Sequence, residues 1–234
     1  MTLDDPSLVR EQYADETRLA TRKRAHEFGE GPDAREIVFA AVRDAHAGRI
    51  LEVGCGEGEL AERMSRELHT EVVAVDQSER MVELAGARGV DARVGDVQSL
   101  DFDDETFDCT VAAWMLFHVE DLDGALGELV RVLRPGGRLV AATNGRDHFR
   151  ELYELAGAAP LDSRFNSDNA KGALLRHFSS VERIDARGWV VFPDRRAAQD
   201  YVDSAISLSG HVVPAVDGPI RVRRTPSIFV AEKA

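Results

Sequence analysis

From Arg49 to Thr143 the sequence alternates between short apolar runs and longer amphipathic stretches, and this alternation restricts the fold more than any other feature. It predicts parallel strands joined by helices, because a strand buried on both faces needs a continuous apolar sequence and a crossover helix. The expected strands are 49–53, 71–76, 90–94, 107–113 and 138–143. The expected helices are 59–68, a helix from the N-cap Ser78 to about Arg88, and 121–133. The sequence therefore predicts an α/β fold with helices on both faces of a mostly parallel sheet.

Helical patterns flank this region on both sides. Two stretches, roughly 7–24 and 33–46, precede it. After it the pattern predicts helices 148–156, 171–178 and 194–207, a strand within 181–192 and a last short strand at 227–231. We expect one domain over residues 1–234, because this length suits a single hydrophobic core. Its parts are N-terminal helices (1–47), a ligand-binding core (48–145) and an insertion with the last strands (146–234).

The composition of the chain restricts the classes of binding partner that we expect. The formal net charge of −13 repels phosphate backbones, so we expect no nucleic-acid partner. No apolar run approaches the roughly 18 to 20 residues that span a bilayer, and the N-terminal residues lack the pattern of a signal peptide. We therefore expect a cytoplasmic protein with no membrane partner. Cys55 and Cys109 have no metal-ligand spacing, so we expect neither a disulfide framework nor a metal site.

A glycine-rich loop, Gly54-Cys55-Gly56-Glu57-Gly58, follows the first expected strand and precedes a helix. Glycines let a loop at the carboxyl end of a parallel strand turn sharply and approach a ligand closely. The dinucleotide-binding fingerprint requires glycine or alanine at the position where this chain has Glu59. An acid at this position would face the phosphates of a dinucleotide. Acids at Glu57 and Glu59 favour a ligand with a cationic centre and no phosphates. S-adenosylmethionine (SAM) is such a ligand, and a dinucleotide is the alternative.

Two further acids follow strand ends. Asp76 ends the second strand, where a carboxylate can accept hydrogen bonds from both hydroxyls of a ribose; the alternative is a helix cap, which Ser78 can also supply. Asp96 follows the third strand, where an acid can accept from an adenine amino group while Val97 offers an apolar wall. The alternative there is an ordinary Gly-Asp turn. Both acids support an adenosine ligand.

These segments together resemble the class I SAM-dependent methyltransferases, in particular the group called methyltransferase type 11. ILEVGCGEGEL and VVAVDQSERM resemble the family's first and second motifs. GDVQSLDFDDETFDCTVAAWMLFHVEDL resembles the adenine-contacting loop and fourth strand, and LRPGGRLVAATN the turn into the fifth strand. The resemblance implies a Rossmann-like seven-stranded sheet whose last strand, 227–231, is reversed.

The resemblance also implies ligand roles. Glu52, Gly54 and Gly56, with Cys55 between the glycines, would face the methionine portion of SAM. Asp76 would hold the ribose, and Gln77 and Met81 the edge of the adenosine. The adenine would lie against Asp96, Val97 and the carbonyl of Ala113.

A weaker resemblance extends outward. Tyr13 and the stretch from Leu19 through Arg22 to His26 resemble the N-terminal lid of small-molecule methyltransferases, and we expect Tyr13 and Arg22 to close over SAM. The alternative is a solvated helix face. The segment 144–152, which includes His148, resembles a related subgroup of unassigned substrate. We expect the N-terminal helices and residues 148–224 to form a lid over the acceptor.

The expected reaction is methyl transfer from SAM, with S-adenosylhomocysteine as product, to nitrogen or oxygen of a small molecule. His118, after the fourth strand, is the candidate catalytic base for a hydroxyl acceptor, and lining the cofactor pocket is its alternative role. Trp114 either lies near the sulfonium, as a cation–π partner, or packs. Arg221, Arg223 and Arg224 form a basic patch that either pairs with surface acids or receives an acidic substrate. The rival functions are an NAD(P)-dependent oxidoreductase, which the absent Tyr-x-x-x-Lys pair disfavours, and a non-catalytic SAM-binding regulator.

Overall fold

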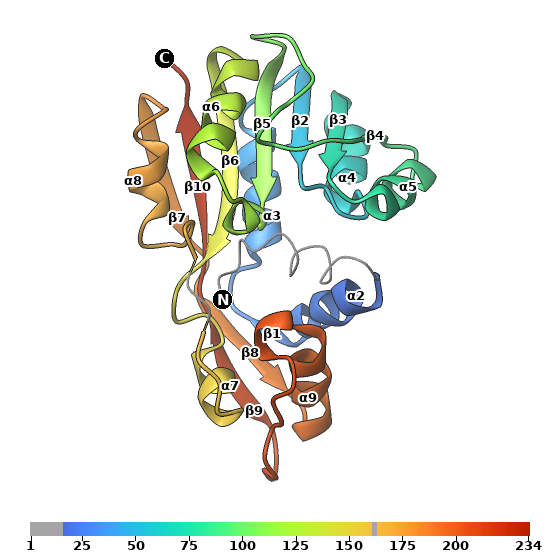
Figure 1. Ribbon diagram of the computed structural model, residues 1–234, viewed down its shortest axis with the longest axis vertical. Coiled ribbons are helices and arrows are strands. Elements are labelled where there is room, and N and C mark those ends of the chain that lie inside the picture. The colour runs from blue at the N-terminus through green and yellow to red at the C-terminus, as the bar shows by residue number, and fades with distance from the viewer. Residues whose placement is uncertain (1–15, 161–162) are drawn as a thin grey trace.

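A mixed seven-stranded sheet forms the larger part of the molecule (Figure 1). The computed structural model describes residues 16–160 and 163–234. In spatial order the strands are β4 (Asp91–Val94), β3 (Glu71–Asp76), β2 (Arg49–Val53), β5 (Phe107–Ala113), β6 (Leu133–Asn144), β10 (Pro226–Glu232) and β7 (Ser180–Asp185). The strands from β4 to β6 are parallel, and β10 runs antiparallel to both of its neighbours. The predicted sheet with its reversed last strand is confirmed.

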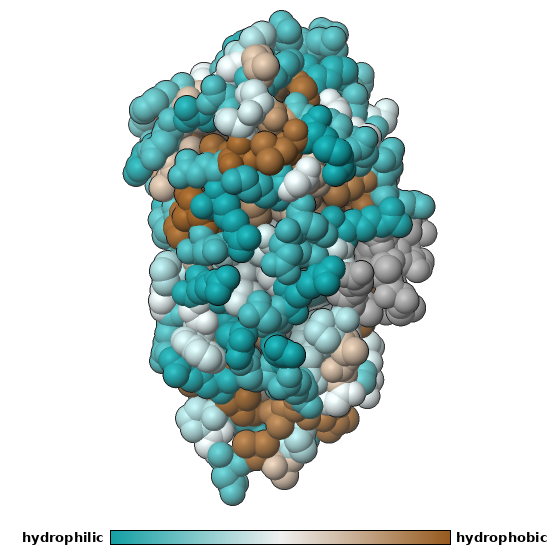
Figure 2. All heavy atoms as spheres, turned by 90° about the vertical axis from the view of Figure 1, so that its left-hand side faces the viewer, coloured by the Kyte–Doolittle hydropathy of each residue, from teal (hydrophilic) through white to brown (hydrophobic). Residues whose placement is uncertain are grey.

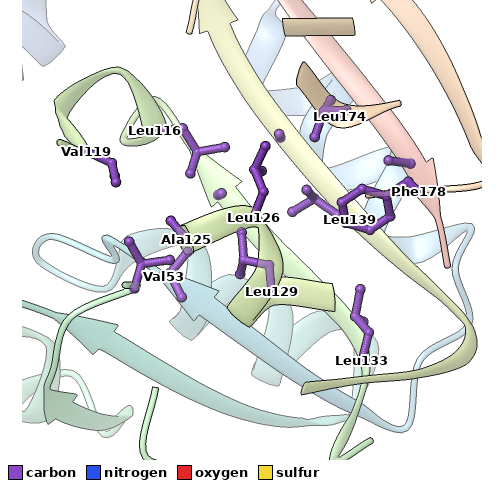
Figure 3. Close-up of a cluster of buried hydrophobic side chains, with 14 of the residues drawn as sticks. Val53, Leu116, Val119, Ala125, Leu126, Leu129, Leu133, Leu139, Leu174 and Phe178 are labelled. Atoms are coloured by element: carbon purple, nitrogen blue, oxygen red, sulfur yellow. The ribbon is translucent and has the colours of Figure 1, made fainter. Parts of the chain in front are cut away.

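Helices cover both faces of this sheet, as the sequence predicted. One face packs against α3 (Ala34–Arg43), α4 (Glu59–Leu68) and α5 (Glu79–Ala87). The other packs against α6 (Leu122–Val132) and α8 (Ala170–Leu174). Figure 3 shows how Leu126 and Leu129 of α6 project toward Leu139 of β6. All three side chains are fully buried, and burial of each contributes about 1.5 to 3 kcal/mol.

Short polar side chains fix where the helices begin. Asp33, Ser78, Asp121 and Asp194 are N-caps whose side chains accept a hydrogen bond from a backbone amide in the first turn. Each such cap satisfies one amide that has no partner inside its own helix. The starts of these four helices are therefore locally encoded.

A second, three-stranded antiparallel sheet lies below the first in Figure 1. Its strands are β1 (Gly29–Glu30), β8 (Gly188–Phe192) and β9 (Ile220–Arg224). A separate apolar cluster joins it to α7 (Arg150–Leu155) and α9 (Arg195–Ser204). The N-terminal helix α2 (Glu16–Ala25) packs against α9. The stretches before and after the core thus come together as one group of elements.

Two strand predictions need correction. The stretch 181–192 is two strands: β7 ends at Asp185 in the large sheet, and β8 begins at Gly188 in the small one. Gly188 allows this change of sheet because a Cβ there would collide with the carbonyl oxygen of Glu30 in the neighbouring strand. The sequence reasoning also missed β9, whose charged sequence IRVRR was interpreted only as a basic patch.

Two further boundaries differ from the expectations. Strand β6 starts at Leu133, so the Pro135-Gly136-Gly137 segment lies inside this strand, where its pairing with β5 shifts register, and not before it. Residues 7–15 of the expected N-terminal helix lie outside the described residues.

The surface is mostly hydrophilic on the face that Figure 2 presents, with apolar side chains gathered in its upper part and at its lower end. Within residues 16–160 and 163–234 no helix is long and apolar enough to cross a membrane.

Candidate functional site

The glycine loop lies where β2 ends and α4 begins, at the carboxyl edge of the large sheet. Gly54 has φ +66°, and a Cβ there would lie 2.7 Å from the Cβ of Met115. Gly58 has φ +77°, and a Cβ there would lie 2.7 Å from that of Ala85. Both positions therefore require glycine for conformation and for space. The amides of Gly54 and Cys55 donate to the carbonyl oxygen of Val75, which ties the loop to β3.

Two carboxyl groups lie beneath this loop, Glu52 buried and Asp76 half-buried. Glu52 is 4% exposed, and its Oε2 has no hydrogen-bond partner among the described residues. Burial, with the nearby charge of Asp76, raises the pKa of Glu52 to about 8. Asp76 accepts hydrogen bonds from the amides of Gly56 and Ser78, both at 2.9 Å, and burial raises its pKa above the usual range. A buried carboxyl oxygen without a partner is costly, so Glu52 is poised for a cation.

The expected adenine-side residues lie mostly on one cavity wall. Gln77, Asp96, Val97 and Ala113 line it, together with Gly54, Cys55 and Gly56. Asp96 is exposed, and its carboxylate accepts from the side-chain amide and the backbone amide of Gln98.

Met81 does not line this cavity. Its side chain is buried inside the first turns of α5, and its backbone amide donates to the Ser78 cap. A direct contact of this side chain with adenosine therefore has no support in the structure.

Helix α2 covers the glycine loop. Leu19 lies 3.8 Å from where a Gly56 Cβ would be, and Lys23 bridges Glu57 and Glu59 at 2.8 and 3.0 Å. Arg22 lines the cavity and donates to the carbonyl oxygen of Ser204 at 2.7 Å, which fastens α2 to α9. The two acids of the loop thus have a lysine partner. Tyr13 lies outside the described residues.

His118 and Trp114 follow the carboxyl end of β5. His118 ends a short 3₁₀ helix (Leu116–His118), packs against the ring of Phe117 and lines the cavity. Trp114 has φ +56°, a conformation that costs a non-glycine residue about 1 kcal/mol or more. Hydrogen bonds to Ala142 and Asn144 of β6 hold it there. Strain of this kind at a cavity is typical of a side chain that is held for function.

The cavity, of about 1480 Å³, continues from the glycine loop to the small sheet. Its far end is lined by polar and aromatic side chains from the short 3₁₀ helix after α2, the loop before α7, and α7, α9 and β9: His26, His148, Tyr153, Tyr201 and Arg224. Burial lowers the pKa of His26 to about 4 and that of His148 to about 3, so both rings are neutral near pH 7.

Sequence reasoning missed this group because its members lie far apart along the chain. The available signal was β9 itself, since alternation along a strand places Arg224 on the opposite face from Arg221 and Arg223.

Comparison with known proteins agrees with this geometry. Residues 51–141 match the family model described as a methyltransferase domain. A ubiquinone/menaquinone biosynthesis C-methyltransferase of Desulfotalea psychrophila is 36% identical over 159 residues, which cover 63% of this chain and 65% of that protein. A ubiquinone biosynthesis O-methyltransferase of Methylocella silvestris is 34% identical over 116 residues, which cover 47% and 45%. The chain thus spans less than two thirds of the length of these curated relatives.

Solved structures share the fold. A SAM-dependent methyltransferase of Thermotoga maritima superposes with a TM-score of 0.58 at 22% identity, over 94% of this chain and 98% of that one. The YcgJ protein of Bacillus subtilis gives a TM-score of 0.60 at 18% identity, over 85% and 98%.

The residues of the cavity fit SAM. The glycine loop leaves room for close approach, the Asp76 carboxylate lies at the end of β3, and the unpartnered Glu52 oxygen suits a cationic group. Residues 51–141 thus match a methyltransferase domain, and the sheet order and this loop are those expected of a class I SAM-dependent methyltransferase core.

Proposed function

We propose that the protein transfers a methyl group from SAM to a nucleophilic atom of a small molecule bound in the same cavity. The observation that carries this proposal is the continuity of the cavity. It joins the glycine loop of the large sheet to a chamber that reaches the small sheet, and α2 covers it. A cofactor and an acceptor can therefore meet in one continuous cavity, as an in-line displacement requires.

SAM supplies the activated methyl group, so the work of this chain is to hold, orient and shield the reactants. We assign Asp76 to the ribose, Glu52 to the cationic methionine portion, and Asp96, Val97 and Ala113 to adenine. Helix α2 excludes water from the site, and the ion pairs of Lys23 with Glu57 and Glu59 hold this helix over the loop.

His118 is the proposed base for a hydroxyl acceptor. It lines the cavity together with Trp114 and Met115, and all three residues follow the carboxyl end of β5. A base here would take the hydroxyl proton as oxygen attacks the methyl group, and such assistance contributes about 10² to 10⁴ in rate. An acceptor nitrogen that is already unprotonated needs no base.

The acceptor atom is proposed as oxygen or nitrogen. Among the relatives, one is named a C-methyltransferase and one an O-methyltransferase, so carbon is the second candidate.

Calorimetric titration with SAM, S-adenosylhomocysteine and NADH, followed by transfer of label from methyl-labelled SAM, tests the proposal. We expect micromolar binding of both sulfur ligands, no NADH signal and labelled product from a panel of phenols, carboxylates and amines. NADH binding alone would favour an oxidoreductase. Tight SAM binding with no transfer to any acceptor of the panel would favour a non-catalytic regulator.

A further inference from the structure

The three arginines of β9 have different surroundings. Arg221 and Arg223 face outward and pair with acids: Arg221 with Glu30 at 3.1 Å, Arg223 with Glu151 at 2.7 Å. These two confirm the interpretation of the patch as surface ion pairs. Arg224 faces the other way, is 5% exposed and lines the cavity. It therefore needs a separate explanation.

Arg224 has no carboxylate partner within 4.0 Å among the described residues. Its Nη2 donates to the carbonyl oxygen of Pro32 at 2.6 Å, and its buried Nε has no partner there. The guanidinium lies over Gly29 and Gly188, where a Cβ would come within 3.1 and 3.4 Å of it. A single carbonyl leaves most of the five guanidinium donors without an acceptor, and burial of an unpaired charge is costly.

The charged groups that face Arg224 leave the region positive. Asp33 and Arg35 line the same part of the cavity. The carboxylate of Asp33 is already engaged, because it accepts from the amide of Arg35 at 2.9 Å and lies 3.6 Å from the Arg35 guanidinium. Asp33 and Arg35 are both exposed and pair with each other, so the buried charge of Arg224 remains without a carboxylate partner among the residues described there. An anion would restore its balance.

His148 adds a hydrogen-bond donor beside Arg224. Its Nδ1 accepts from the amide of Thr225 at 3.1 Å, so the neutral ring carries its proton on Nε2. The ring stacks on Phe149 at 4.3 Å, which fixes its orientation. The same hydrogen bond disqualifies His148 as a base, because the nitrogen that could accept a proton is occupied. His148 can donate to an acceptor oxygen and does not remove its proton.

Aromatic side chains form the rest of this chamber. Tyr201 packs edge-on against Phe149 at 4.9 Å, and Tyr153 shares a hydrogen bond with Ser207 at 2.7 Å. Flat apolar walls of this kind suit a planar ligand body.

We infer that this end of the cavity is the acceptor subsite, and that the acceptor is a planar organic molecule whose carboxylate is held by Arg224 and His148. The inference rests on the proposed methyl transfer and names its substrate class. The alternative is that Arg224 only anchors the Pro32 carbonyl and so holds the segment after β1 against β9.

The test measures binding to the complex with S-adenosylhomocysteine, in which no methyl transfer occurs. The ligands are benzoate, 4-hydroxybenzoate and phenylacetate, each beside its primary amide, which has nearly the same shape without the charge. The variants are Arg224→Met and Arg224→Lys. The matched control is Arg221→Met, which removes an arginine from the outward face of the same strand.

We expect at least one acid to bind about tenfold or more tightly than its amide in the unaltered protein. Arg224→Met should abolish this preference and Arg224→Lys should retain part of it, while Arg221→Met leaves it unchanged. S-adenosylhomocysteine affinity reports that each variant is folded.

Either of two results would overturn the inference while the cofactor still binds: no acid preferred over its amide, or a preference that survives Arg224→Met. Since the acid-to-amide comparison is made first in the unaltered protein, a misfolded variant does not remove the test. Failure of S-adenosylhomocysteine itself to bind would instead contradict the proposed function.

Discussion

The two ends of the cavity differ in the ionisable group that lacks a hydrogen-bond partner among the described residues, a carboxyl group at one end and a guanidinium group at the other. At the glycine loop the lining includes Glu52, Asp76 and Asp96, and Glu52 lacks a partner for one buried oxygen. At the small sheet the lining includes Arg224 and two histidines that burial keeps neutral. An acidic end suits a sulfonium cofactor, and a basic end suits an anionic acceptor. Under the two proposals above, the cavity would sort two ligands of opposite charge to its two ends.

The comparison separates what variants at each end should change. Substitutions at the acidic end should alter cofactor affinity, and substitutions at the basic end should alter acceptor affinity. A variant between the ends, at His118, should alter the rate alone.

The largest expected effect is on the rate, at His118. If the acceptor is a hydroxyl, His118→Ala should lower the single-turnover rate with SAM bound by about 10² or more, because the base is lost. Affinity for S-adenosylhomocysteine should stay within about twofold of the unaltered value.

His69→Ala, at the exposed end of α4, is the matched control. If His118→Ala instead abolished cofactor affinity and left the single-turnover rate of the SAM complex unchanged, His118 would be a residue of the cofactor pocket and not a base.

The next effect concerns the acidic end alone. Asp76→Ala removes a charged acceptor from the ribose position and also leaves the amides of Gly56 and Ser78 without their partner. We expect SAM affinity, measured by calorimetry, to fall about 10- to 100-fold. Asp91→Ala, which breaks a surface pair with Arg93, should leave it unchanged. Equal affinity in the Asp76 variant would contradict the ribose assignment.

The acidic end could be predicted from sequence, because its residues are contiguous with strand ends. A glycine loop after an apolar strand and an acid 18 residues beyond Gly58 place Glu52, Gly54 and Asp76 at one sheet edge through local rules alone. The caps at Ser78, Asp121 and Asp194 were predictable for the same reason.

The basic end could not be predicted, because it is assembled by tertiary contacts. His26 and Arg224 are 198 positions apart in the chain, and only the pairing of β1, β8 and β9 brings their segments to one chamber. A stretch such as 181–192 gives no local sign that its two halves join different sheets. The opposite direction of Arg224 from its two neighbours was accessible only once IRVRR was recognised as a strand.

A pH effect should distinguish Glu52 from the other acids of its end. In the ligand-free protein its pKa is about 8, so near pH 7 the side chain is protonated, and a bound cation favours the carboxylate. SAM binding at pH 7 should therefore release a proton, which calorimetry in buffers of different ionisation enthalpy detects. Glu52→Gln should abolish this release and weaken SAM binding.

Glu52→Gln should weaken SAM binding but stabilise the ligand-free fold at high pH. Because the folded-state pKa is raised, from 4.5 to about 8, the contribution of Glu52 to stability is present below pH 4.5 and is lost as pH rises to about 8. Each tenfold difference in proton affinity is worth about 1.4 kcal/mol. Glu52→Gln should thus raise the melting temperature at pH 8.5 and leave it unchanged at pH 4.5. A lower melting temperature at pH 8.5 would show that the ionised carboxylate is already stabilised without ligand.

The smallest expected effect is at the cover of the acidic end. Lys23 reaches both Glu57 and Glu59, but it is 30% exposed and Glu59 is 50% exposed, so water and salt screen the bridge. Lys23→Met should speed dissociation of S-adenosylhomocysteine about two- to fivefold at low salt, as stopped-flow displacement would measure. The difference from the unaltered protein should shrink at 1 M salt. Arg66→Met, which removes surface pairs on the far part of α4, is the control.

Unaltered dissociation at low salt would mean that apolar contacts such as that of Leu19 over Gly56, and not charge, hold α2 on the loop. The position of α2 over the loop would then not depend on the charge of either end of the cavity.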